Sequence, residues 1–185
     1  MKTVFHIPVL PAVSALFAAI LFSGCAATHP SIPMDGVQIA SKVAALRGSL
    51  KGLGKDTDPI EAGRVAETAV TYSLRLAEDY RVSPPARWHN LLIQMGFRDR
   101  GLCFHWTEDL MKHLQALDLK TYELHWGVAH QGSELREHNS VVITALNQSF
   151  EEGLVLDPWR NSGDLYWAVV GKDRYPWLPL PREEW

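Results

Sequence analysis

The hydrophobic side chains change their spacing near residue 120, and this change limits the possible folds more than any other feature of the chain. Before it, apolar residues recur every three or four positions, which is the spacing of one face of an α-helix. After it, Tyr122, Leu124, Trp126 and Val128 alternate with more polar residues, as in a strand with one buried face. Helices followed by strands predict the α+β class, with N-terminal helices packed on an antiparallel sheet.

The predicted helices carry recognisable start signals. Asp58 can cap a helix N-terminus, and Pro59 suits the first turn that follows it. Ser83 and Pro84 repeat this signal, and Gly96 is a suitable C-cap for the run between them. The four predicted helices span residues 37–50, 58–80, 84–95 and 103–117.

Three further β-rich runs follow the first strand, "HNSVVITAL", "GLVLDPW" and "DLYWAVV", and turn-like segments separate them. They begin at His138, Gly153 and Asp164. The proline-rich tail "KDRYPWLPLPREEW" predicts an extended strap over the surface.

Composition supports a single domain of ordinary globular type. The 185 residues are 46% hydrophobic and 21% charged, which is enough for one core. The formal net charge of −3 provides no cationic surplus for a phosphate backbone. We therefore expect no nucleic acid partner.

The N-terminus reads as an export signal. Lys2 precedes an apolar run that ends in small residues, which is signal-peptide architecture. The ending "LFSGC" resembles the bacterial lipobox, whose cysteine, here Cys25, takes the lipid and becomes the mature N-terminus. Ala26 after that cysteine implies, by the same resemblance, the outer membrane facing the periplasm of the cell envelope. The expected division is a signal peptide over residues 1–24, a tether over 25–36 and one domain over 37–185.

The second cysteine, Cys103, follows Gly101 closely and opens a predicted helix. If Cys25 carries lipid, Cys103 is a free thiol in an oxidising compartment, where cysteines are usually paired. A helix N-terminus favours negative charge, so a thiolate would be stabilised there. The alternative is a disulfide between Cys25 and Cys103 in an unlipidated protein.

A histidine and an aspartate flank a predicted hairpin. If the chain turns near residues 147–148, His138 lies opposite Asp157 at one edge of the sheet. The carboxylate can then hold the imidazole in one tautomer and stabilise its protonated form. A helix packed on this sheet can bring Cys103 to the histidine, in the order nucleophile, base and orienting acid.

Three blocks, "RGLC", "EHNSVVI" and "GLVLDPW", together resemble the transglutaminase-like cysteine enzymes, which share a papain-like core. The resemblance covers about Arg98 to Trp159. It implies that Cys103 is the nucleophile, His138 the general base and acid, and Asp157 the residue that orients it. The family often has an aromatic residue directly after the histidine, where this chain has Asn139.

The resemblance implies a thiol hydrolase or acyltransferase that acts on an amide or ester through a thioester, without a cofactor. The expected substrate is a peptide, a protein or peptidoglycan in the periplasm, and the lipid holds the protein to the membrane. The alternative function is an inactive lipoprotein that uses the same fold to bind a partner in the envelope.

Other groups of residues give weaker signals. Cys103 and the histidines near it lack paired ligand spacing, so we expect no metal site. Arg98 and Arg100 could bind an acidic substrate group or belong to a solvated loop, and the loop is favoured. The backbone N–H of Cys103 is a natural oxyanion donor, and Gln94 or Trp88 could supply a second.

Overall fold

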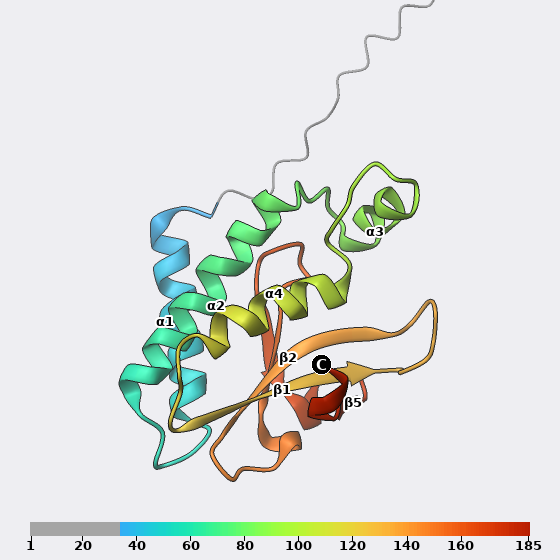
Figure 1. The fold of residues 1–185 in the computed structure, drawn as a ribbon. Coiled ribbons are helices and arrows are strands. Elements are labelled where there is room, and N and C mark those ends of the chain that lie inside the picture. Colours follow the sequence, from blue (N-terminus) through green and yellow to red (C-terminus); the bar gives the residue numbers. More distant parts are fainter. Residues whose placement is uncertain (1–33) are drawn as a thin grey trace, which may run out of the picture.

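The computed structural model describes residues 34–185 and has two layers (Figure 1). Helices α1, α2 and α4 cover one face of a five-stranded sheet, whereas α3 stands to one side of them. This arrangement confirms the α+β class and the antiparallel sheet. The helices are α1 (Gly36–Lys51), α2 (Pro59–Asp79), α3 (Ala86–Gln94) and α4 (Cys103–Gln115).

The Asp58–Pro59 start signal operates in the structure, whereas the Ser83–Pro84 signal was wrong: α3 begins at Ala86, and its N-cap residue Pro85 has no side chain that can accept a hydrogen bond. Asp58 caps α2 and accepts a hydrogen bond from the Ile60 N–H at 2.7 Å, and Pro59 is the first helical residue. Helix α4 begins at Cys103, as expected, and ends two residues before the predicted end. No helix within residues 34–185 has the length and apolar content to cross a membrane.

The sheet has the strand order β4-β3-β2-β1-β5, and all neighbours are antiparallel. The tail was predicted as an extended strap over the surface, and part of it forms a regular strand, β5, that pairs with the edge of β1. Prolines are tolerated on an edge strand because one side of that strand needs no hydrogen-bond donor. The strands are β1 (Tyr122–Ala129), β2 (His138–Ala145), β3 (Leu154–Asp157), β4 (Tyr166–Val169) and β5 (Trp177–Pro179).

Both faces of the sheet are covered. Because β2 is also the middle strand, it lies at the centre of the molecule. The main core lies between the helices and the sheet, and a second cluster covers the opposite face, where Trp177 of β5 and Val170 pack on β2 and β3. All eight residues of β2 are buried. The largest fully buried aliphatic side chains of the main core are Leu46, Leu50, Leu110, Leu114, Ile143, Leu156 and Leu165.

The predicted register of β2 and β3 is wrong by two residues. Val141 lies opposite Leu156, so Asp157 is not directly opposite His138. The connection between the strands is longer than the predicted turn because it contains a 3-10 turn over Phe150–Glu152. Side chains alternate along a strand, so a shift of two keeps His138 and Asp157 on the same face of the sheet.

A buried carboxylate joins the helical layer to the first strand. Glu61 in the first turn of α2 is 6% exposed and accepts hydrogen bonds from the Lys120 N–H, the Thr121 N–H and the Thr121 hydroxyl at 2.7, 2.8 and 2.7 Å. Burial by itself raises the pKa of Glu61, but these hydrogen bonds outweigh it and hold the pKa below its usual value. The contact fixes where β1 begins relative to α2.

Replacing Glu61 with Ala should therefore lower the free energy of unfolding by about 2–4 kcal/mol, because three part-buried donors lose a buried, charged acceptor. Urea unfolding at neutral pH measures this loss. Glu67→Ala changes an exposed glutamate on the same helix and should cost less than about 0.5 kcal/mol. Equal losses in the two variants would contradict a special role for Glu61.

Candidate active site

Close packing fixes the loop that leads into Cys103. Gly101 has a φ of +121°, and a Cβ there would lie 2.4 Å from His89 Nε2, so only glycine fits. The His89 ring is itself held on both sides: Nδ1 accepts from the Ser83 N–H at 3.2 Å, so Nε2 carries the proton and donates to the Arg100 carbonyl at 2.9 Å. Steric crowding by His89 thus explains why the "RGLC" block has glycine at position 101.

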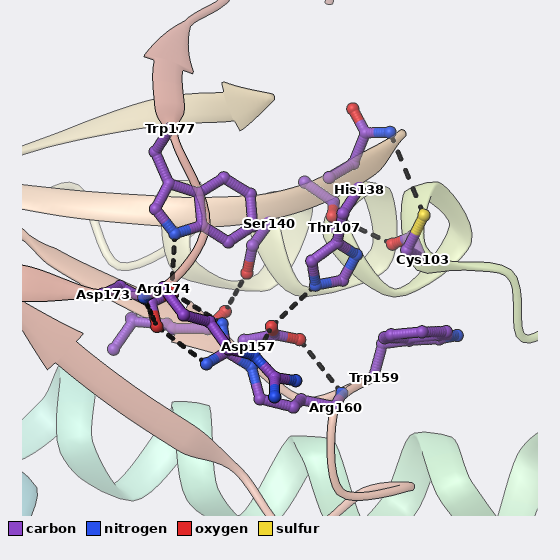
Figure 2. A network of polar contacts seen from close by, with 12 residues as sticks. Cys103, Thr107, His138, Ser140, Asp157, Trp159, Arg160, Asp173, Arg174 and Trp177 are labelled. Atoms are coloured by element: carbon purple, nitrogen blue, oxygen red, sulfur yellow. Dashed lines mark hydrogen bonds and ion pairs between the residues drawn. The ribbon is translucent and has the colours of Figure 1, made fainter. Parts of the chain in front are cut away.

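Two hydrogen bonds from α4 hold the turn around the thiol. The Trp106 indole donates to the Gly101 carbonyl at 2.9 Å. The Thr107 hydroxyl donates to the Cys103 carbonyl at 3.0 Å (Figure 2). Cys103 is a free cysteine and partly exposed, whereas Trp106 and Thr107 are each 1% exposed. A rigid, buried support therefore carries an accessible sulfur at the first residue of a helix.

His138 lies between Asp157 and Cys103 (Figure 2). Its Nε2 donates to Asp157 Oδ2 at 2.7 Å, and the two residues are 3% and 0% exposed. Because the Nε2 proton is engaged in the hydrogen bond to Asp157, Nδ1 is the nitrogen that can exchange a proton with the sulfur. Nδ1 is buried and has no hydrogen-bond partner within the described residues, so nothing else competes for it.

The surroundings of His138 favour its protonated form. Burial by itself lowers the pKa of His138, but the hydrogen bond to Asp157 and the neighbouring Cys103 outweigh it and raise the pKa to about 9. At neutral pH both ring nitrogens of His138 therefore carry a proton, and the imidazole is positively charged. It can balance a negative sulfur and later give the proton to a leaving group.

An arginine and a second aspartate continue the network beyond Asp157. Arg160 Nε donates to Asp157 Oδ2 at 2.9 Å, and its two terminal nitrogens bind the carboxylate of Asp173 at 2.9 and 2.7 Å. Burial by itself raises the pKa of Asp173, but Arg160 and the Trp177 indole N–H lower it to about 2. Charges of alternating sign therefore run from His138 to Asp173 in the interior (Figure 2).

Three aromatic rings enclose the imidazole of His138. The ring centroids of Trp159, Tyr175 and Trp177 lie 4.7, 4.8 and 5.2 Å from the centroid of His138. These rings exclude water from the imidazole and its hydrogen bond to Asp157, which strengthens that interaction. Only the side of His138 that faces Cys103 is left for chemistry.

Comparison with known protein families, curated proteins and solved structures finds no match to this chain. The function is therefore inferred from side-chain geometry. The structure brings Cys103, His138 and Asp157 together from α4, β2 and β3. Cys25, the predicted lipid attachment site, lies outside the described residues.

The structure also places the candidate oxyanion donors, the two arginines before Cys103 and the residue types that bind metals. Trp88 and Gln94 lie exposed on α3, and neither hydrogen bonds to a residue of the site within the described chain. Arg100 pairs with Glu108 and Asp109, and Arg98 donates to two backbone carbonyls, so both guanidinium groups are used within the protein. No group of three or more His, Cys, Asp or Glu is placed to hold a metal ion between residues 34 and 185.

Sequence reasoning missed the outer part of the network. The spacing of Asp157 and Arg160 in "DPWR" was an available signal, because a tight turn after a strand can fold such a pair together. Asp173 and Trp177 gave no local signal, since they reach the site only through the tertiary path of the tail. Asn139 was noticed only as a departure from the family pattern.

The raised pKa of His138 links protonation to stability. The unfolded value is 6.5 and the folded value about 9, so the stabilisation is complete below pH 6.5 and is lost as the pH rises to 9. Wild-type protein should lose up to about 3 kcal/mol of unfolding free energy over this range. The exposed-site control His113→Gln should show the same loss in urea titrations, whereas His138→Gln should show much less. Parallel curves for all three proteins would refute the linkage.

Proposed function

We propose that this protein is a cysteine hydrolase or acyltransferase of transglutaminase-like fold, with Cys103 as nucleophile, His138 as base and acid, and Asp157 as the orienting residue. The observation that carries the proposal is the buried His138–Asp157 pair, whose free Nδ1 faces the sulfur at a helix N-terminus. A structural histidine normally uses both ring nitrogens when it is buried, as His89 does.

The proposed reaction has two stages. The Cys103 thiolate, balanced by the His138 imidazolium, attacks the carbonyl carbon of an amide or ester. The tetrahedral intermediate collapses as the Nδ1 proton passes to the leaving amine or alcohol, and a thioester remains on the sulfur. His138 then takes a proton from a water or an amine that attacks the thioester, which releases an acid or a new amide and restores the thiolate.

Cellular context forms part of the proposal. The lipobox-like segment ending at Cys25 supports export and a lipid anchor in the outer membrane, facing the periplasm. Peptides, proteins and peptidoglycan stems are the amide substrates of that compartment. The tether over residues 25–36 keeps the domain within roughly 42 Å of the membrane, since an extended chain spans at most about 3.5 Å per residue.

The reactivity of the thiol tests the catalytic proposal directly. Cys103 of the wild-type protein should react with iodoacetamide at pH 6.5 at least ten times faster than free cysteine, because His138 stabilises the charged sulfur. His138→Gln should remove most of this advantage, and His113→Gln should keep it. A wild-type rate equal to that of free cysteine, unchanged in His138→Gln, would instead favour the inactive binding module.

Intact mass of the protein from bacterial membranes tests the anchor. We expect a chain that begins at Cys25 and carries added acyl mass, and a Cys25→Ser variant without that mass that no longer sediments with the outer membrane. A mature chain that starts elsewhere, or whose mass falls by two hydrogens for a Cys25–Cys103 disulfide, would contradict lipidation. This measurement is independent of catalysis.

A further inference from the structure

Asn139, the residue directly after the base on β2, makes side-chain contacts that the proposed chemistry has not used. Its side-chain Nδ2 lies 3.9 Å from Cys103 Sγ, within the longer reach of hydrogen bonds to sulfur. Its Oδ1 accepts a hydrogen bond from the Trp126 indole at 2.7 Å. Asn139 is only 8% exposed, so its amide is held in place rather than solvated.

The Trp126 contact decides which way the amide points. An indole N–H can only donate, so the atom that faces it must be the amide oxygen. The NH₂ group is therefore turned toward the sulfur, where one proton can meet Sγ while the other faces Glu137 Oε1 at 3.4 Å. Trp126 thus acts as a clamp that presents a donor to the nucleophile.

We propose that Asn139 is a further catalytic residue, whose amide N–H donates a hydrogen bond to the Cys103 sulfur when it carries negative charge. Neighbouring residues on a strand point to opposite faces, so His138 and Asn139 approach the sulfur from different directions. The 3.9 Å contact tightens when charge develops, because catalytic hydrogen bonds are often long before substrate binds. This inference rests on the proposed function, since it assigns a role at the same sulfur.

The groups on the strand side of the sulfur include Glu137, which favours the neutral thiol, and Asn139, which favours the thiolate. The Glu137 carbonyl lies 3.9 Å from Sγ and suits the neutral thiol, which can donate to it. The exposed Glu137 carboxylate accepts from the Gly132 N–H and opposes negative charge on the sulfur. A compensating donor such as Asn139 is therefore needed beside His138.

The charges on the helix side are already neutralised. His105 Nδ1 accepts from the Gly101 and Leu102 N–H groups, and burial followed by the charge of Arg100 lowers the pKa of His105. Arg100 itself pairs with Glu108 and Asp109. Within the described residues, His138 and Asn139 are thus the side chains that can donate to the sulfur.

The test is the pH profile of Cys103 alkylation by iodoacetamide in the full-length protein. Asn139→Asp keeps an oxygen for the Trp126 indole but removes the N–H donor. We expect its rate at pH 7 to fall at least tenfold, the midpoint of the profile to move up by at least one pH unit, and the rates to converge with wild type near pH 10. Asn139→Leu, which has no polar atom, should give the same shift.

Asn90→Asp is the matched control. Asn90 also accepts an indole N–H, that of Trp159 at 3.1 Å, but it does not touch the sulfur, so its profile should match wild type. Trp126→Phe should give an intermediate shift, because it frees the amide without removing it. Urea unfolding verifies that each variant is folded at the pH values used.

The outcomes separate the two proposals. A fast wild-type thiol that depends on His138 but is unaffected in both Asn139 variants would overturn the role of Asn139 and leave the proposed function standing. A wild-type thiol no faster than free cysteine would overturn both. A profile shifted equally in Asn90→Asp and Asn139→Asp would show a general effect of added charge and would also overturn the role of Asn139.

Discussion

The buried negative charge of Asp157 is the interaction on which the rest of the site depends. A fully buried carboxylate is tolerated only when it is paired and hydrogen bonded. Asp157 meets this requirement with His138 Nε2, Arg160 Nε and the Arg160 backbone N–H. Arg160 in turn is neutralised by Asp173, which the Trp177 indole also holds. The need to compensate one charge thus draws three separate segments of the chain to one place, β2, residues 157–160 and residues 173–177.

Much of the fold could be predicted from local patterns in the sequence. The change from helical to alternating spacing near residue 120 predicted the two halves of the domain, and the Asp58–Pro59 signal located the start of α2. The edge strand β5 could not be predicted in this way, because Pro179 argues against a strand unless the chain is known to lie at a sheet edge. Pairing partners are a tertiary property, and no local spacing encodes them.

The candidate triad could be predicted because the prediction depends on which face of the sheet a side chain occupies, and not on the exact register. The predicted register was off by two, yet an even offset leaves His138 and Asp157 on one face of the sheet, and their side chains span the diagonal. An odd offset would have separated them completely. Arg160, Asp173 and the donor role of Asn139 lay beyond such reasoning, because each depends on side-chain directions that only packing determines.

The path of the tail has a consequence for the order in which the protein matures. The chain is synthesised from its N-terminus, so α4 and its thiol emerge well before Asp173 and Trp177. Until that last segment docks against β1, Arg160 lacks Asp173, its second counter-charge, and His138 lacks two of its three aromatic walls. Full assembly of the surroundings of Cys103 and His138 therefore waits for the tail, and a newly synthesised chain carries an incomplete site until its folding ends.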